Sequence, residues 1–241
     1  METQIAIRTQ ILPDAEAVAT EAAKVIAAQA RAAVAARGRF MMAVSGGHTP
    51  WQMLRALANE DVPWKSVRVF QVDERIAPAG DSDRNLTHLR ESLLEHAPLP
   101  GDQIYAMPVE EPDIEAAAEN YARKLQQIAG TPPVLDLVHL GLGPDGHTAS
   151  LVPNDPVLNV NDRDVAITGL YQGRKRMTLT YPVINRARCV LWVVTGDEKV
   201  NSLLQLEKGD TSIPAGRIRR EQASVLADQA AAGPNFGKVV A

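Results

Sequence analysis

Segments with the hydrophobic spacing of a helix alternate along the chain with short apolar segments typical of strands. Residues 14–37 place apolar side chains at helical spacing, and Gly38 follows as a helix end. Residues 40–44 and 189–194 are short and almost wholly apolar, which is typical of strands buried on both faces. The alternation of strand-like and helix-like segments predicts an α/β fold, with a mostly parallel sheet covered by helices on both faces.

The remaining segments fit the same interpretation. We expect further strands at residues 3–7, 67–72, 134–140 and 224–227, and further helices at residues 51–58, 84–96, 113–129 and 197–206. Thr49 is expected to cap the first of these helices, with Pro50 in its first turn. Residues 165–168 and 177–180 are expected to form a small antiparallel pair. The sequence contains no internal repeat or long polar linker, so residues 1–241 are expected to form one domain.

Three polar clusters follow expected strands, at residues 45–49, 73–75 and 143–147. In sheets of this kind, ligands bind beyond the carboxyl ends of the strands. Three segments that are far apart in the sequence are therefore expected to converge on one rim. This convergence is the strongest physical indication of a binding site.

The first cluster has the features of an anion site. Gly46 and Gly47 let the backbone approach a ligand closely, and the helix that follows presents unpaired N–H groups. The loop from Ser45 to Thr49 therefore suits a phosphate monoester. A strand–turn–helix corner without a ligand is the alternative, and the loop alone does not decide between the two.

The second cluster and a later basic run supply candidate cations. Arg75 can clamp a phosphate or a carboxylate through two parallel hydrogen bonds, and Asp73 can orient a catalytic group or act as a base. Arg176 is the best placed of the basic residues 174–176 to reach the same ligand. The alternatives are solvated charges, an internal salt bridge or a protected strand edge.

The third cluster is the most informative, because residues 141–151 form a glycine-rich loop, with Gly143 in it, directly after an apolar strand. A histidine has an ordinary pKa near 6.5, so a neutral His147 can take a proton from water. Asp145 can orient its imidazole or stabilise the imidazolium. The alternative is a histidine that only caps a helix, but the glycines and the nearby carboxylate favour catalysis.

Composition excludes several other classes of function. The net charge is −4 and only 4% of residues are aromatic, which argues against binding nucleic acid. A single cysteine, Cys189, rules out an intramolecular disulfide, and the sequence has no zinc-binding motif, so no metal is expected. The sequence has no apolar run long enough to cross a membrane and no secretory signal, so a cytoplasmic location is expected.

These motifs resemble those of the 6-phosphogluconolactonase family. Residues 45–50 (SGGHTP) resemble its SGGxTP signature, residues 73–75 its DER signature, and residues 141–153 its long GxGxDGHxASLFP signature. Further matches are Arg176 with the residues after it, Thr195, Gly196, Lys199, Pro214 and Ala215. Two departures are Val152, where phenylalanine is usual, and Arg84 before Asn85, where serine is common.

The resemblance implies hydrolysis of 6-phospho-D-glucono-1,5-lactone by a Rossmann-like fold shared with glucosamine-6-phosphate deaminase. It implies that His147 is the base, with Asp145 beside it, and that no cofactor takes part. The implied substrate contacts are Ser45, Gly46, Gly47, Thr49, Asp73, Arg75, Asn85, Gly143 and Arg176. The partner is then a small sugar-phosphate lactone, without nucleic acid or membrane, and the protein a monomer or a small homo-oligomer.

Two other functions compete with this one. A sugar-phosphate isomerase or deaminase would use Asp73 as a carbon base and His147 to open the ring. The deaminase pattern continues after its Gly-His with Ala-Phe-Asn-Glu-Pro, whereas residues 147–151 here read His-Thr-Ala-Ser-Leu, without that glutamate. A non-catalytic sensor usually accompanies a DNA-binding domain, and the chain has no helix-turn-helix segment for one.

Overall fold

The computed structural model describes residues 7–234 and 236, and it contains two sheets. The strands are β1 (Arg8–Leu12), β2 (Phe40–Val44), β3 (Val67–Gln71), β4 (Asp73–Arg75), β5 (Ile104–Tyr105), β6 (Leu137–Leu140), β7 (Val165–Ile167), β8 (Arg176–Leu179), β9 (Val190–Val194) and β10 (Ala223–Asp228). The helices are α1 (Ala15–Arg37), α2 (His48–Leu57), α3 (Asn85–Leu89), α4 (Ile114–Ala129), α5 (Tyr181–Arg186), α6 (Val200–Lys208) and α7 (Gln229–Ala232).

The larger sheet has seven parallel strands in the order β1-β10-β9-β6-β2-β3-β5. From β2 the chain moves outward through β3 to β5, and it then returns to the other side of β2 to add β6, β9 and β10. The strand order therefore reverses between β2 and β6. In open α/β sheets this reversal leaves a crevice at the carboxyl ends of the two strands, where ligands bind.

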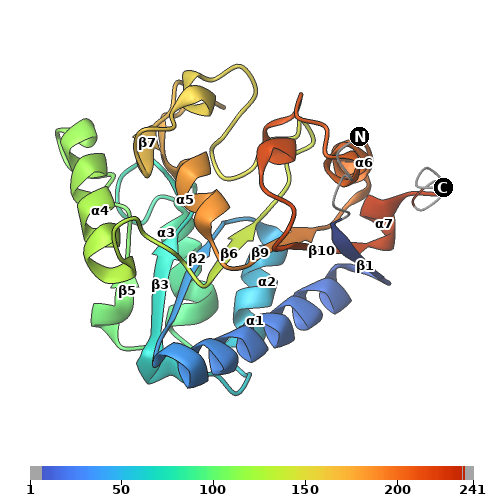
Figure 1. The fold of residues 1–241 in the computed structure, drawn as a ribbon, viewed down its shortest axis with the longest axis horizontal. Helices are drawn as coiled ribbons and strands as arrows, with labels where there is room; N and C mark the ends of the chain where they lie inside the picture. The colour runs from blue at the N-terminus through green and yellow to red at the C-terminus, as the bar shows by residue number, and fades with distance from the viewer. Residues whose placement is uncertain (1–6, 235, 237–241) are drawn as a thin grey trace.

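The sheet has a separate apolar core on each face, as predicted. Side chains alternate along β2, so Phe40 and Met42 belong to one core, while Met41 and Ala43 belong to the other. The first core packs against α1, α2 and α3, and the second against α4, α5, α6 and α7. Figure 1 shows α1 on the side of the sheet opposite α5 and α6.

A second sheet of three antiparallel strands, in the order β4-β8-β7, lies against the second core. The predicted pairing of β7 with β8 is confirmed. Residues 73–75, which were expected only as a polar cluster after a strand, form a strand of this second sheet. They form β4, which pairs with β8 in the register Asp73–Thr178 and Arg75–Arg176. The end of β3 thus continues directly into the other sheet, and this brings two distant polar segments together.

Most of the expected elements are present, and the differences are local. The helix after β2 begins at His48 with Gly47 at its N-cap, so the prediction that Thr49 caps it is wrong. The hydroxyl of Thr49 instead lies 2.6 Å from that of Thr195. Most of the strand expected at 3–7 lies outside the described residues, and the first described strand is β1. No helix of the described part is long and apolar enough to cross a membrane.

Candidate active site

A cavity of about 300 Å³ lies at the reversal point, between the carboxyl ends of β2 and β6 and the strands β4 and β8. Its lining includes every residue predicted for the site except Asp145, namely Ser45, Gly46, Gly47, Thr49, Asp73, Arg75, Asn85, Gly143, His147 and Arg176. The predicted convergence of three segments is therefore confirmed. The catalytic and substrate-binding roles of these residues remain predictions.

His147 and Asp145 form a hydrogen-bonded pair at the edge of the cavity. Nδ1 of the imidazole lies 2.6 Å from Oδ1 of Asp145, which also accepts the backbone N–H of His147 at 3.1 Å. Since the carboxylate only accepts, this pairing favours the tautomer with a proton on Nδ1 and a lone pair on Nε2. Burial would raise the pKa of Asp145, but the charge and hydrogen bonds of His147 and a hydrogen bond from Tyr171 hold it below its ordinary value.

Gly143 has to be a glycine because the imidazole packs directly against its backbone. A Cβ built at this position would overlap Nδ1 and Cε1 of His147 and lie 2.7 Å from Oδ1 of Asp145. The backbone N–H of Gly143 also donates to the carbonyl of His147 at 2.8 Å. The loop therefore closes on itself around the histidine and fixes where its ring lies.

Arg75 and Arg176 face each other across the β4–β8 pair, and both line the cavity. Like charges directly opposite on neighbouring strands are unfavourable unless an anion lies between them. Arg176 is only 4% exposed, and burial lowers its pKa, an effect that Asp73 opposes and Arg75 reinforces. This arrangement of two cations is suited to bind a phosphate.

Asn85 connects Arg75 to Asp73. Its side-chain oxygen accepts a short hydrogen bond from Nη1 of Arg75, and its amide donates to the carbonyl oxygen of Asp73 at 2.9 Å. The carboxylate of Asp73 accepts the hydroxyl of Ser150 at 2.6 Å and the amide of Asn85 at 3.3 Å. Both oxygens of Asp73 are thus engaged by donors, which leaves it poorly placed to act as a carbon base.

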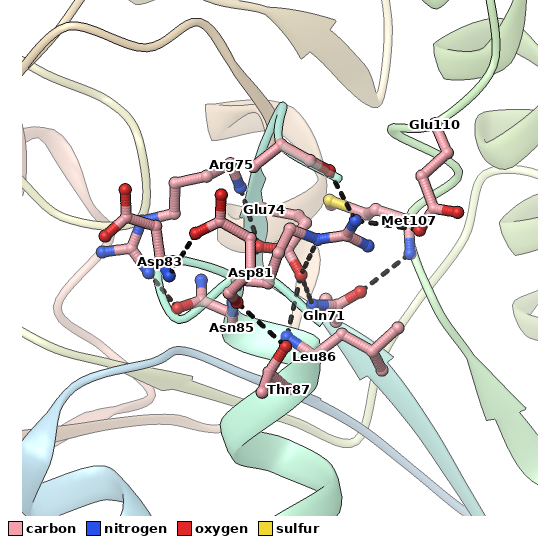
Figure 2. Close-up of polar contacts among 12 residues, drawn as sticks. Gln71, Glu74, Arg75, Asp81, Asp83, Asn85, Leu86, Thr87, Met107 and Glu110 are labelled. Carbon is pink, nitrogen blue, oxygen red and sulfur yellow. Dashed lines mark hydrogen bonds and ion pairs between the residues drawn. The ribbon is translucent and has the colours of Figure 1, made fainter. Parts of the chain in front are cut away.

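Glu74, between Asp73 and Arg75 in β4, is completely buried. Figure 2 shows the polar groups gathered around its carboxylate. Its oxygens accept hydrogen bonds of 2.8 Å from Gln71 Nε2 and from the backbone N–H groups of Arg75, Asn85 and Leu86. Arg84, one of the two departures from the family pattern, forms ion pairs with Glu74 at 3.2 Å and with Glu110 at 2.9 Å. The structure therefore gives Arg84 a structural role, in which it balances the buried charge of Glu74.

The glycine loop after β2 is held by a buried histidine of β6. The backbone N–H of Ser45 donates to Nδ1 of His139 at 3.2 Å, and the hydroxyl of Ser45 donates to the His139 carbonyl at 3.0 Å. Burial lowers the pKa of His139 from 6.5 to about 3, so the ring stays neutral and can accept that bond. His139 is completely buried in β6, between the two apolar cores.

Because His139 is buried and neutral, we expect the protein to lose stability as the pH falls. Between pH 6.5 and about 3 the unfolded chain binds a proton at His139 and the folded chain does not. The free energy of unfolding therefore decreases as the pH falls through this window, by about 1.4 kcal/mol per pH unit from this residue. In urea unfolding between pH 6 and 4, His139→Asn should lose stability less steeply than the wild type. Parallel curves for the two proteins would contradict the assignment.

Several lining or neighbouring residues carry chemistry that the residue pattern alone did not assign to the site. Thr195 and Lys199 line the cavity, and they were singled out only as matches to the family. Glu198 also lines it and lies 3.3 Å from the ammonium of Lys199. Tyr171 contacts His147 and Asp145 from a turn with no recognisable signature. Only the packing of β7 and β8 could have located it.

The comparisons agree with the geometry. A family model described as glucosamine-6-phosphate isomerases/6-phosphogluconolactonase matches residues 13–227. The chain belongs to this family. The curated 6-phosphogluconolactonase of Nostoc sp. (strain PCC 7120) is 34% identical over 231 residues, which cover 93% of this chain and 96% of the relative. That of Synechocystis sp. (strain PCC 6803) is 41% identical over 166 residues, 67% of this chain and 69% of the relative.

Solved structures show the same fold. The 6-phosphogluconolactonase from Thermotoga maritima superposes with a TM-score of 0.82 at 28% identity, and the match covers 92% of this chain and 98% of the other. A monomeric glucosamine-6-phosphate deaminase reaches a TM-score of 0.81 at 17% identity, covering 94% and 99% of the two chains. This second likeness, at 17% identity, shows the fold alone.

Proposed function

We propose that the protein hydrolyses 6-phospho-D-glucono-1,5-lactone to 6-phospho-D-gluconate, the lactonase step of the oxidative pentose phosphate pathway. The observation that carries the proposal is a single cavity that combines an imidazole oriented by a carboxylate with two opposed arginines. The long signature around His147 and the curated lactonases among the relatives support it.

A δ-lactone is an activated ester, so its hydrolysis needs an aimed water and a base. Nε2 of His147 takes a proton from water as the water oxygen bonds to the carbonyl carbon. The bond from this carbon to the ring oxygen then breaks, and the ring oxygen receives the proton from the imidazolium. Asp145 stabilises the imidazolium between the two transfers. This sequence of steps requires no metal or redox cofactor.

The phosphate at the far end of the substrate provides the anchor. Arg75, Arg176 and the loop 45–49 bind it, while Asn85 and Asp73 hold Arg75 in place. Binding energy from this remote group positions the lactone carbonyl near His147. The loop 45–49 contributes backbone N–H groups at the start of α2, where the helix dipole favours an anion.

Removing one anchor should affect substrate binding more than the chemical step. Arg75→Ala is expected to raise KM by about 10- to 100-fold, the equivalent of one charge-assisted hydrogen bond. Arg55→Ala, on the exposed side of α2, is the matched control and should behave as the wild type. Steady-state kinetics with fresh lactone measure both. An unchanged KM in Arg75→Ala would remove this residue from the anchor.

A substrate comparison tests the function itself. The purified protein is given freshly prepared 6-phosphogluconolactone, glucosamine 6-phosphate or ribose 5-phosphate, and proton release, ammonia and ketose formation are followed. Proton release above the spontaneous rate with the lactone alone is the expected result. Ammonia from the amino sugar, or isomerisation of the pentose, would replace the proposal with one of the competing activities.

We further propose that residues 1–241 act as one domain, as a monomer or a small homo-oligomer, and in the cytoplasm. Unfolding in a single cooperative transition, a light-scattering mass of one or a few chains, and recovery of the activity in the cytoplasmic fraction are expected. Two unfolding transitions would argue against the single domain.

A further inference from the structure

One tyrosine that does not line the cavity contacts the catalytic pair. The hydroxyl of Tyr171 donates to Oδ2 of Asp145 at 3.0 Å and lies 3.3 Å from Nδ1 of His147. We propose that Tyr171 is a positioning residue, which fixes Asp145, and through it the tautomer and orientation of His147, and connects this pair to Arg176. The inference rests on the proposed function and adds a residue to it.

The first part of the argument is the orientation of the carboxylate. Oδ1 of Asp145 is engaged by the ring and the backbone of His147, and Oδ2 is engaged by Tyr171. Donors on both oxygens hold the carboxylate in one orientation against the imidazole. An aspartate held in this way keeps the partner histidine in one tautomer, and loss of the correct tautomer is costly for base catalysis.

The second part is the connection to the anchor. The guanidinium of Arg176 lies over the face of the Tyr171 ring, 4.9 Å from its centre, and the rings of Tyr171 and His147 form a T-shaped pair with 5.4 Å between their centroids. Arg176 also donates from Nη2 to the side-chain oxygen of Gln172, the residue that follows Tyr171, at 3.0 Å. The Tyr171 ring thus contacts Arg176, which is proposed to bind the phosphate, and also His147, which is proposed to be the base.

The turn that carries Tyr171 is held firmly. Its backbone N–H donates to the carbonyl of Arg174 at 3.0 Å, and the reverse bond is 3.2 Å. Arg174 in turn forms ion pairs with Asp81 and Asp83, at 3.1 and 2.8 Å, in the loop that leads into α3. Figure 2 shows Asp81 and Asp83 in this loop, where the backbone N–H of Asp83 donates to the carboxylate of Asp81. The turn is therefore attached to the element that holds Arg75.

Two substitutions separate the roles of the hydroxyl and the ring. Tyr171→Phe keeps the ring and is expected to lower kcat by about tenfold with little change in KM, because one hydrogen bond to a charged group is lost. Tyr171→Leu removes the ring as well and should also raise KM through Arg176. The control is Tyr181→Phe, which removes a hydroxyl that donates to Pro214 at 2.9 Å and should leave both constants unchanged.

A double-mutant cycle then distinguishes positioning from general stabilisation. If Tyr171 acts through Asp145, Tyr171→Phe should have little further effect in an Asp145→Asn background. A full tenfold loss in that background, or a wild-type kcat for Tyr171→Phe alone, would overturn the inference.

Nitrogen NMR of the His147 ring adds a readout that does not depend on turnover. The wild type should show a proton fixed on Nδ1, and Tyr171→Phe a mixture of tautomers. A single Nδ1–H tautomer in both proteins would contradict the inference, whatever the substrate. Absence of lactonase activity in a wild type with a fixed tautomer would instead reject the proposed function and leave this positioning role standing.

Discussion

His147→Ala is expected to lower kcat for the lactone by about 100- to 10,000-fold, the usual contribution of a general base. In the proposed mechanism the imidazole takes the proton from water, and Asp145 is not placed to replace it, because it pairs with Nδ1 of the ring and does not line the cavity. The proposed phosphate anchor does not include His147. The dissociation constant for 6-phosphogluconate, measured by calorimetry, should therefore change little.

The matched control is His96→Ala, which removes an exposed imidazole that lies outside the cavity and forms a hydrogen bond with the backbone carbonyl of Glu91. It should retain wild-type kinetics. Wild-type turnover in His147→Ala would exclude the histidine from the mechanism, while loss of product binding together with turnover would indicate a collapsed site. Partial recovery by added imidazole would support proton transfer directly, because the truncated side chain leaves room for it.

The parts of the fold that the sequence predicts well are those decided by burial alone. Strands β2 and β9 are apolar along their length because they lie in the middle of the sheet with a core on each face. Helix α1 is similarly evident, since its apolar stripe faces one core and Gly38 ends it. Such features depend on neighbouring residues only, and a single sequence contains them.

Pairings between segments that are far apart in the chain are harder to predict from the sequence. Residues 73–75 read as a polar loop after a strand, and only their pairing with β8, about a hundred residues later, makes them a strand of a second sheet. The same pairing sets Arg75 opposite Arg176. Charge patterns suggest each arginine separately, but their opposition, which is the strongest physical argument for an anion, exists only in three dimensions.

The residues that support the site could not be identified from the sequence pattern for a related reason. Glu74 reads as one member of a charged triplet, yet it is buried, with four hydrogen-bond donors around it. Tyr171 lies in a short turn between two basic residues and a glycine, where no periodicity applies. The residues proposed to contact the substrate belong to recognisable signatures, whereas those that hold them in place are identified by their contacts.

Gly143→Ala is expected to abolish most of the activity without removing any functional group. The new Cβ would overlap the His147 ring and crowd Oδ1 of Asp145, so the ring must move by about the width of an atom. Displacements of about 1 Å at a reacting group can cost about 100-fold in rate. We expect kcat to fall by about 100-fold or more, close to the effect of His147→Ala, while KM and product binding change far less.

The control for this substitution is Gly101→Ala, because a Cβ at Gly101 meets no atom within 4 Å and the residue lies outside the cavity. It should leave kcat and KM unchanged. Combining Gly143→Ala with His147→Ala tests the cause: if the alanine acts by displacing the imidazole, the double variant should be no slower than His147→Ala alone. A further large loss would mean that Gly143 contributes separately, through its own backbone, and full activity in Gly143→Ala would contradict the close packing on which the proposed orientation of the base depends.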